Sequence, residues 1–444
     1  MKRILIVGGG YAGFYTAWKL EKRLRPDEAE LTVVDPRPYM TYQPFLPEVL
    51  AGSIEARHAA VSLRRHLHRT RVLAGWVREV DHAHKSVTVQ PVDGEEFTLG
   101  YDIIVVTAGA VTRKFPVPGI AEQAIGLKNV EEAVAIRDRL LTSFDRAAVL
   151  PPGRLRRKLL TITFVGGGFS GVEGLGELLS LATSLLRKYP ELDRSELRFH
   201  LVEASDRVLP EVSRDQGEWV VRSLQRRGAQ VHLKTVVESA VDGLVVLSDG
   251  AEFDSGLIVW TAGNDSNPVV RKHTDLPVTE RGLIVVRPDL RVGTETEPVP
   301  DAWAAGDDAA VPDLVTGGHT VPNAQHAVRQ GNHLARNIAA SLHGRKTKAY
   351  VHHSLGAVAT LGYGRGIFQY RKLTIRGLLA WLMHRGYHVL AVPTWERKVR
   401  VAAVWITAFL FGRDIVSLAS VEHPRDAFVS GGDPAVTNHT AALS

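Results

Sequence analysis

The sequence predicts an α/β protein with two Rossmann-like, doubly wound dinucleotide-binding domains. A glycine-rich fingerprint occurs at residues 8–13 and again at residues 166–171, and each copy follows a short apolar strand and opens a helix. After each fingerprint comes a second apolar strand that ends in an acid, and later a strand that runs into Ala-Gly. Because three features recur in the same order, the chain is expected to contain two copies of one architecture.

The first copy begins with an apolar strand at residues 4–7, which leads through the glycine loop into a helix. Its second strand, residues 31–35, ends in Asp35, 22 residues after Gly13. That position places a carboxylate where the ribose hydroxyl of an adenosine would lie. A third strand starts near residue 102 and runs into a turn at Ala108 and Gly109.

The second copy has its first strand at residues 161–165 and its acid-ended strand at residues 199–203. Glu203 follows Gly171 by 32 residues, so a longer helix and loop are expected between them. A carboxylate at this position repels a 2′-phosphate, which favours NAD(H) over NADP(H). Arg207, four residues further on, leaves open that a phosphate is bound there.

The segments between and after the two copies have their own signals. A proline-rich linker occupies residues 116–119, and a helix is expected over residues 129–149. A strand leads to Gly306 and Asp307, where a carboxylate can accept hydrogen bonds from a polyol; the alternative is a turn or helix-cap aspartate. The helix that starts near Ala324 could direct its N-terminus at a flavin carbonyl.

Composition limits the possible chemistry. The 444 residues are 45% apolar, enough for two or three globular domains. The absence of cysteine excludes disulfides, thiolate zinc sites, iron–sulfur clusters and redox-active thiol pairs. The apolar stretch after the basic start has only four residues before Gly8, so we expect a retained, cytoplasmic N-terminus.

Positive charge is concentrated near the C-terminal end. Residues 365–413 contain nine Lys or Arg and one acid, a net +8, whereas the whole chain carries +6. An anionic partner is therefore expected at this segment. Nucleic-acid binding is not expected, because the basic residues alternate with long aliphatic runs. A metal site is not expected either, because the 18 histidines show no metal-binding spacing.

The same segment contains two apolar stretches. Apolar residues recur with helical spacing over residues 373–385, and residues 401–411 are almost wholly apolar but too short to span a bilayer. Both predict a monotopic membrane anchor, with basic side chains at anionic headgroups. The alternative is a dimer interface or a cover for the first domain. Residues 422–444 are polar and expected to be disordered.

These features together resemble the flavoprotein superfamily that binds FAD in one domain and a nicotinamide nucleotide in an inserted sister domain. Within it, the chain up to about residue 418 resembles type II NADH dehydrogenases, the non-proton-pumping NADH:quinone oxidoreductases. The implied organisation is an FAD-binding domain at residues 1–118 and 282–345 with an NADH-binding domain at residues 119–281. A membrane-anchoring region at residues 346–421 and the tail at residues 422–444 complete it.

The resemblance also implies roles for single residues. Glu173, after the second glycine loop, would couple nicotinamide, flavin and quinone; the alternative is a first-turn carboxylate stabilised by the helix dipole. The residues implied for non-covalent FAD binding are Gly8, Gly10, Gly13, Asp35, Ala108, Gly109, Gly306 and Asp307. Those implied for NADH binding are Gly166, Gly168, Gly171 and Glu203.

Two positions depart from the family pattern. The quinone-pocket motif Ala-Gln-x-Ala-x-Gln matches Ala324, Gln325 and Ala327, but Arg329 replaces the second glutamine. A guanidinium can donate a hydrogen bond to a quinone but cannot accept one. Residues 41–48 resemble the flavin-facing turn, with Pro-Glu at 47–48 where Tyr-Gln is frequent, so a different pocket shape is expected.

The predicted function is therefore FAD-dependent reduction of a membrane quinone, menaquinone or ubiquinone, by NADH in respiratory electron transport. A homodimer held peripherally at the cytoplasmic face of the cell membrane is expected. One alternative is an NADH-dependent ferredoxin or rubredoxin reductase whose acidic partner docks on the basic segment. Another is a redox-sensing flavoprotein with weak turnover. The thiol-dependent branch of the superfamily is excluded by the absence of cysteine.

Overall fold

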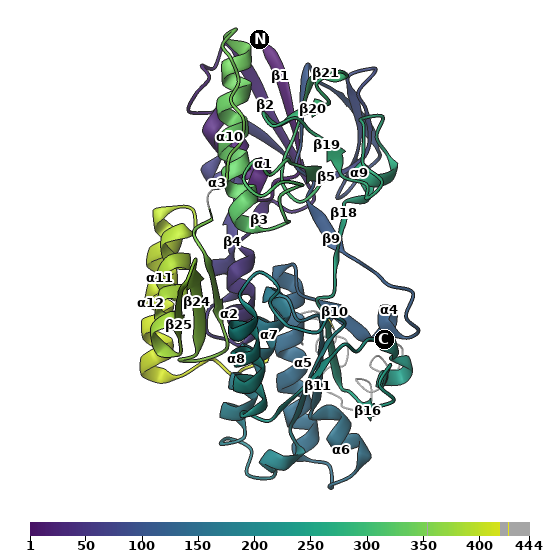
Figure 1. Cartoon of the computed structure of the whole chain (residues 1–444), viewed down its shortest axis with the longest axis vertical. Helices are drawn as coiled ribbons and strands as arrows, with labels where there is room; N and C mark the ends of the chain where they lie inside the picture. Colours follow the sequence, from purple (N-terminus) through teal and green to yellow (C-terminus); the bar gives the residue numbers. More distant parts are fainter. Residues whose placement is uncertain (353, 418–424, 426–444) are drawn as a thin grey trace. The chain divides into compact units, whose positions relative to one another are not determined.

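The computed structural model describes residues 1–352, 354–417 and 425, and in it the chain forms two compact units (Figure 1). Unit 1 comprises Met1–Gln43, Ala59–Arg113 and Gly263–Leu355. Unit 2 comprises Pro44–His58, Lys114–Ala262 and the described chain from Gly356 onward. The tail expected at residues 422–444 lies outside the described residues, except for Arg425.

Unit 1 is built on an eight-stranded sheet whose parallel centre carries the first glycine loop. Ile4 of the first strand is in register with Leu31 on one side and Ile103 on the other. The strand is apolar from Ile4 to Val7 because both faces of a parallel sheet are covered. In spatial order the strands are β20 (Arg291–Gly293), β21 (Pro298–Ala304), β8 (Ile103–Val106), β1 (Lys2–Val7), β2 (Ala29–Asp35), β5 (Thr70–Asp81), β6 (Ser86–Pro91) and β7 (Phe97–Gly100).

Helices α1 (Tyr11–Leu20) and α10 (Ala324–Leu342) lie side by side in this unit (Figure 1). Gly331 permits their close approach, because any Cβ at this position would lie only 2.5 Å from the Ala12 carbonyl oxygen. The smaller elements are α3 (Leu63–His66), α9 (Pro268–Lys272) and the paired strands β3 (Tyr39–Thr41) with β4 (Ala60–Ser62), β9 (Ala110–Thr112) with β18 (Asn264–Ser266), and β19 (Ile284–Val285) with β22 (Ala309–Ala310).

Unit 2 repeats the architecture around a parallel five-stranded sheet. Its order is β10 (Ala124–Gly126), β17 (Leu257–Trp260), β11 (Thr161–Val165), β12 (Arg198–Glu203) and β13 (Ala229–Leu233). The expected helix near residues 129–149 is confirmed as α5 (Val130–Ala148), which starts at a capping box between Asn129 and Glu132. The other helices are α2 (Leu46–Leu50), α4 (Ile120–Gln123), α6 (Arg154–Leu159), α7 (Phe169–Leu185) and α8 (Arg214–Gln225). A small sheet contains β14 (Val237–Ser239), β15 (Leu244–Leu247) and β16 (Glu252–Asp254), and 3-10 turns occur at Gln43–Phe45, Ala56–Ala59, Arg194–Glu196 and Val241–Gly243.

The C-terminal part of unit 2 is a three-stranded sheet followed by two helices (Figure 1). Its elements are β23 (Ala357–Thr360), β24 (Gly366–Tyr370), β25 (Leu373–Arg376), α11 (Leu378–Ala391) and α12 (Trp395–Phe411). The chain at the end of β23 packs closely on α7. Gly176 of α7 permits this contact, because a Cβ there would come 2.6 Å from the carbonyl carbon of Leu361, the residue after β23.

The expected helix over residues 373–385 is wrong at its start. Leu373–Arg376 pairs with β24 as a strand, and Gly377, with φ of +77°, breaks the chain direction before α11 begins. The expectation of short apolar helices is otherwise confirmed. Within the described residues, none of the helices has the length and apolarity needed to cross a bilayer.

Candidate functional site

The first glycine loop, between β1 and α1, is a tight turn with one open side. Gly8 has φ of +92°, and a Cβ on Gly13 would lie 1.9 Å from the Gly8 carbonyl oxygen. The Thr107 hydroxyl holds the turn by donating to the Val7 carbonyl at 2.9 Å. A Cβ on Gly10 would meet nothing within 4 Å, so the loop backbone faces open space at the start of α1. This geometry fits a dinucleotide pyrophosphate bound by backbone N–H groups.

Asp35 lies beside this loop at the end of β2. Its two carboxylate oxygens accept hydrogen bonds from the backbone N–H groups of Gly9 and Arg37, each at 2.7 Å. Burial raises the pKa of Asp35, and these two N–H groups oppose the rise. The remaining lone pairs of the carboxylate can accept a ribose hydroxyl.

The second glycine loop, between β11 and α7, repeats this geometry. Gly166 has φ of +109°, and a Cβ on Gly171 would again lie 1.9 Å from the carbonyl oxygen of the first glycine. Thr261 takes the place of the threonine by donating to the Val165 carbonyl at 2.9 Å. A Cβ on Gly168 would meet open space.

Glu203 stands at the second loop as Asp35 does at the first, despite its longer sequence spacing. It accepts hydrogen bonds from the backbone N–H groups of Gly167 at 2.5 Å and Ser205 at 2.7 Å. Arg207 donates to the carbonyls of Leu209 and Val212. One terminal nitrogen of the guanidinium is therefore engaged by its own loop.

The turn at Ala108 and Gly109 faces an acid that the sequence did not single out. Asp308 is fully buried, which raises its pKa to about 7, and the backbone N–H groups of Ala108 and Gly109 oppose that rise. Asp307 lies in the turn after β21, half-buried. Asp307 precedes the strand β22 and not a helix, so the helix-cap alternative is wrong, whereas the turn alternative agrees with the structure.

Gln325 and Arg329 occupy one face of α10, four residues apart. The Arg329 guanidinium lies 2.8 Å from Nδ1 of His352, whose ring lies against that of His326. Gln330 points elsewhere: it is buried and accepts a hydrogen bond from the Gly306 N–H at 2.8 Å. It is therefore part of the packing beside Gly306.

A buried acid cluster lies inside unit 2, formed by Glu48, Glu173 and Glu177. Glu173 is in the second turn of α7, so the first-turn interpretation of this residue is wrong. Its Oε1 accepts a hydrogen bond from the Thr360 N–H at 2.9 Å and lies 3.2 Å from Nε2 of His384. Glu177, one turn later, accepts from the Thr360 hydroxyl.

Basic and aromatic side chains of the C-terminal helices complete the acid cluster. The Glu48 carboxylate accepts a hydrogen bond from the Trp405 indole at 2.7 Å and pairs with Arg385 at 3.0 Å, while Arg413 pairs with Glu177 at 3.1 Å. Burial raises the pKa of Glu48, and the Arg385 charge opposes the rise. Burial, aided by the charge of His384, lowers the pKa of His388 well below its usual range.

Sequence reasoning missed several of these residues. The two threonines had a signal, since Thr-Ala-Gly ends the late strand of both copies, at 107–109 and 261–263. The sequence signal for Asp308 was limited to its place directly after Asp307. The basic partners of the acid cluster had none, because they lie hundreds of residues from their acids.

Comparison with known proteins identifies relatives of this architecture. The model of the family described as pyridine nucleotide-disulphide oxidoreductase matches residues 2–331. A type II NADH:quinone oxidoreductase of Mycobacterium tuberculosis is 28% identical over 93% of this chain and 89% of its own. One from Staphylococcus epidermidis is 29% identical over 82% of this chain and 89% of its own. An NDH2 structure from Plasmodium falciparum in complex with NADH superposes with a TM-score of 0.86 at 17% identity, covering 94% of this chain and 99% of that one.

These matches confirm two predictions made from the sequence. The α/β architecture with two Rossmann-like sheets is confirmed by the superposition. The resemblance to type II NADH:quinone oxidoreductases is confirmed by similarity over most of the chain.

Proposed function

Because the chain belongs to the pyridine nucleotide-disulphide oxidoreductase family, we propose that it is an FAD-dependent NADH:quinone oxidoreductase of the type II, non-proton-pumping class. The observation that carries this proposal is the extent of the similarity. The family model ends at residue 331, whereas the Mycobacterium relative matches 93% of the chain and therefore extends into the C-terminal part. That part distinguishes this chain from relatives that share only the nucleotide domains.

The two glycine loops support binding of two dinucleotides. FAD is assigned to unit 1, on Gly8, Gly10, Gly13 and Asp35, and NADH to unit 2, on Gly166, Gly168, Gly171 and Glu203. Glu203 disfavours a 2′-phosphate by charge repulsion, and Arg207 spends one terminal nitrogen on its own loop carbonyls. NADH is therefore the expected donor.

When bound, FAD supplies acceptance of a hydride and delivery of two electrons to a quinone. The chain's part is to hold the dinucleotides, exclude water and provide charge and protons near the reaction. His384 Nε2 lies 3.2 Å from Glu173 Oε1 in a buried setting, close enough for the two side chains to interact directly. We assign Glu173 the coupling role that the family resemblance implies, with His384 as the residue that positions its carboxylate.

Arg329 is assigned as a hydrogen-bond donor to the quinone, with Gln325 one turn before it on the same helix face. The nearby His352 nitrogen accepts from the guanidinium, which orients it. The substitution Arg329→Gln restores the family motif and directly tests this assignment.

Membrane association through α11 and α12 is the proposed route to the quinone. Phe409, Leu410 and Phe411 are 73%, 64% and 86% exposed, and Val401 is the buried residue of α12. An apolar surface this open, on a segment of net +8, fits the interface of an anionic membrane. A homodimer formed through these helices is the competing arrangement.

The function is tested with purified, FAD-loaded protein and short-chain menaquinone and ubiquinone analogues, with NADH compared with NADPH. Rapid NADH-dependent quinone reduction is expected, and Arg329→Gln should alter the KM for quinone while leaving flavin reduction by NADH unchanged. Rapid flavin reduction without quinone turnover contradicts the quinone assignment. Faster electron transfer to an acidic ferredoxin or rubredoxin would favour that alternative.

Membrane association is tested by sedimentation with vesicles that contain phosphatidylglycerol. Phe409→Asp should weaken partition at least about tenfold, because burying a phenylalanine contributes about 1.5–3 kcal/mol. Val149→Asp replaces a side chain that is 83% exposed on another helix end of unit 2 and serves as the matched control. If Phe409→Asp instead dissociates a dimer without changing vesicle binding, the helices form the subunit interface.

A further inference from the structure

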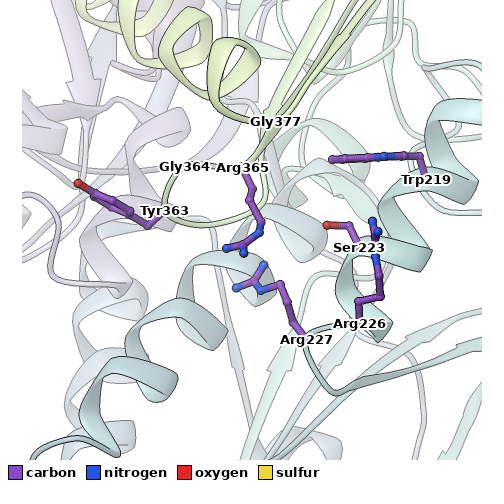
Figure 2. Close-up of a pocket in the computed structure, with 8 residues that line it drawn as sticks. All are labelled: Trp219, Ser223, Arg226, Arg227, Tyr363, Gly364, Arg365 and Gly377. Carbon is purple, nitrogen blue, oxygen red and sulfur yellow. The ribbon is translucent and has the colours of Figure 1, made fainter.

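A cavity in unit 2 is bordered by three arginines and has no part in the proposed electron transfer. It lies between α8 and the turn that joins β23 to β24, with a volume of about 580 Å³, within the usual size of ligand sites (Figure 2). Figure 2 shows the side chains of Arg227 and Arg365 directed toward one another. Trp219 and Ser223 come from α8, and Arg226 directly follows this helix.

None of the residues lining this cavity is acidic. Arg227 donates to the carbonyls of Leu361 and Gly176 and to the Ser180 hydroxyl, all uncharged groups. Burial lowers the pKa of Arg227 to about 10, with the nearby charge of Arg365 as the next cause. The guanidinium therefore stays charged at neutral pH and repels its neighbour.

The other two arginines also have no carboxylate partner among the described residues. Arg226 donates only to the carbonyl of Arg222, at 3.3 Å. Glu177, the acid that acts on Arg227 through its charge, is already occupied by Arg413 and the Thr360 hydroxyl. Glu177 offsets only part of the positive charge around Arg227, and an anion bound in the cavity would offset more of it.

The composition of the cavity selects among anions. Guanidinium groups bind phosphate oxygens with paired, charge-assisted hydrogen bonds, and the Ser223 hydroxyl adds a neutral donor beneath them. Gly377 borders the cavity and is followed directly by Leu378 and Leu379, which are 59% and 57% exposed. An apolar path therefore leads away from the basic cavity along α11.

From this geometry we infer that the cavity between α8 and the β23–β24 turn is a binding site for a phosphate-bearing anion, held by Arg226, Arg227 and Arg365. The ligand is either the headgroup of an anionic phospholipid, with its acyl chains along the exposed leucines, or a soluble phosphate compound. The phospholipid form of this inference rests on the proposed membrane association, because Arg365 belongs to the same basic segment. The soluble form goes beyond it, and neither form depends on which acceptor takes the electrons.

The test uses full-length, FAD-loaded protein and the double variant Arg226→Gln/Arg365→Gln. The control Arg154→Gln/Arg214→Gln also removes two positive charges from unit 2, at arginines that are 75% and 58% exposed and pair with Asp254 and Asp206. Both cavity substitutions are at exposed positions, so the variant should fold, which an unchanged thermal midpoint without ligand would verify.

Two probes distinguish the sources. With vesicles of phosphatidylcholine containing phosphatidylglycerol, the cavity variant should bind about 30-fold more weakly than wild type and clearly more weakly than the control, since each basic residue contributes about fivefold. If the ligand is soluble, inorganic phosphate should raise the thermal midpoint of wild type and control but not of the cavity variant. Equal behaviour of the two double variants toward both probes overturns the inference. NADH oxidation with a soluble quinone analogue should be the same in all three proteins, so a failure of the proposed enzyme activity is distinguished from a failure of this site.

Discussion

Arg385 provides the sharpest stability test because its removal leaves a buried charge. The Arg385 side chain is 12% exposed and the Glu48 side chain 1%, and their atoms are 3.0 Å apart. Breaking such a pair by replacing one partner costs about 3–5 kcal/mol of unfolding free energy. Arg385 also lies over the rings of Trp381 and Trp405, so Arg385→Met loses about a further 0.5–2 kcal/mol of cation–π interaction.

The double variant Glu48→Gln/Arg385→Met separates these two contributions. It removes the unpaired buried charge but does not restore the ring contacts of Arg385. It should therefore recover most of the 3–5 kcal/mol of unfolding free energy and keep the smaller cation–π loss. Urea unfolding followed by tryptophan fluorescence is the assay, because Trp381 and Trp405 flank the substituted position. The midpoint of thermal unfolding should fall by about 6–20 °C for Arg385→Met.

The pH dependence gives a second readout of the same pair. Burial raises the pKa of Glu48, so the protonated acid is favoured in the folded state and stability from this group falls as pH rises through the folded-state pKa. Removing Arg385 raises that pKa further. The deficit of Arg385→Met should therefore be small near pH 4.5 and grow toward neutral pH, and it should be independent of pH in the double variant.

The matched control is Arg400→Met, which breaks a pair with Glu396 one turn away on α12. Arg400 is 54% exposed, so the expected loss is below about 0.5 kcal/mol. The reasoning is refuted if Arg385→Met is no more destabilising than Arg400→Met, or if the double variant recovers nothing.

Three further predictions concern the Glu173–His384 pair, the second glycine loop and the crossing of α1 with α10. His384→Gln should lower quinone reduction about tenfold and change its pH profile, with flavin reduction by NADH unaltered in stopped-flow; an equal loss in both half-reactions would contradict its pairing with Glu173. Glu203→Ser should lower the NADH-to-NADPH ratio of kcat/KM about tenfold or more, and an unchanged ratio would remove Glu203 from the nucleotide site. Gly331→Ala should lower the free energy of unfolding in urea by about 1–3 kcal/mol, because its Cβ would meet the Ala12 carbonyl. Gly10→Ala should weaken FAD binding without that loss of stability. Similar stability of the two variants would argue against the tight crossing of α1 and α10.

The parts of this fold that sequence could predict are those specified by local pattern. The strands and helices around both glycine loops follow from apolar runs and glycine spacing, and β11 occupies the predicted residues 161–165. The start of α11 was mispredicted because Ile375 fits a helical spacing, while its actual place is decided by pairing with Phe368. Propensity at such a short segment yields to tertiary pairing.

The acid cluster was beyond sequence reasoning for a different physical reason. Glu48 and Trp405 are 357 residues apart, and their hydrogen bond exists only because α2 and α12 pack in one unit. Glu173 was identified through a resemblance, but its partner His384 was not, since a histidine in an apolar helix gives no signal of what it faces.

The two copies diverge most in the helix that follows each glycine loop, and this divergence places the acids. Counting from the last glycine of each loop, Glu173 and Glu177 of α7 correspond to Tyr15 and Lys19 of α1. In both copies this helix receives a later part of the chain at close range: α10 meets α1 through Gly331, and the C-terminal sheet meets α7 through Gly176.

The nucleotide cradle itself is nearly unchanged between the copies, with threonine and acid holding the loop by the same contacts. What differs is that the segment packed on α7 brings His384, Arg385 and Arg413 to buried carboxylates. Buried carboxylates on the helix after the glycine loop are therefore a feature of the second copy alone. A buried, paired carboxylate adds little net stability, which is consistent with the role proposed for Glu173 in the reaction.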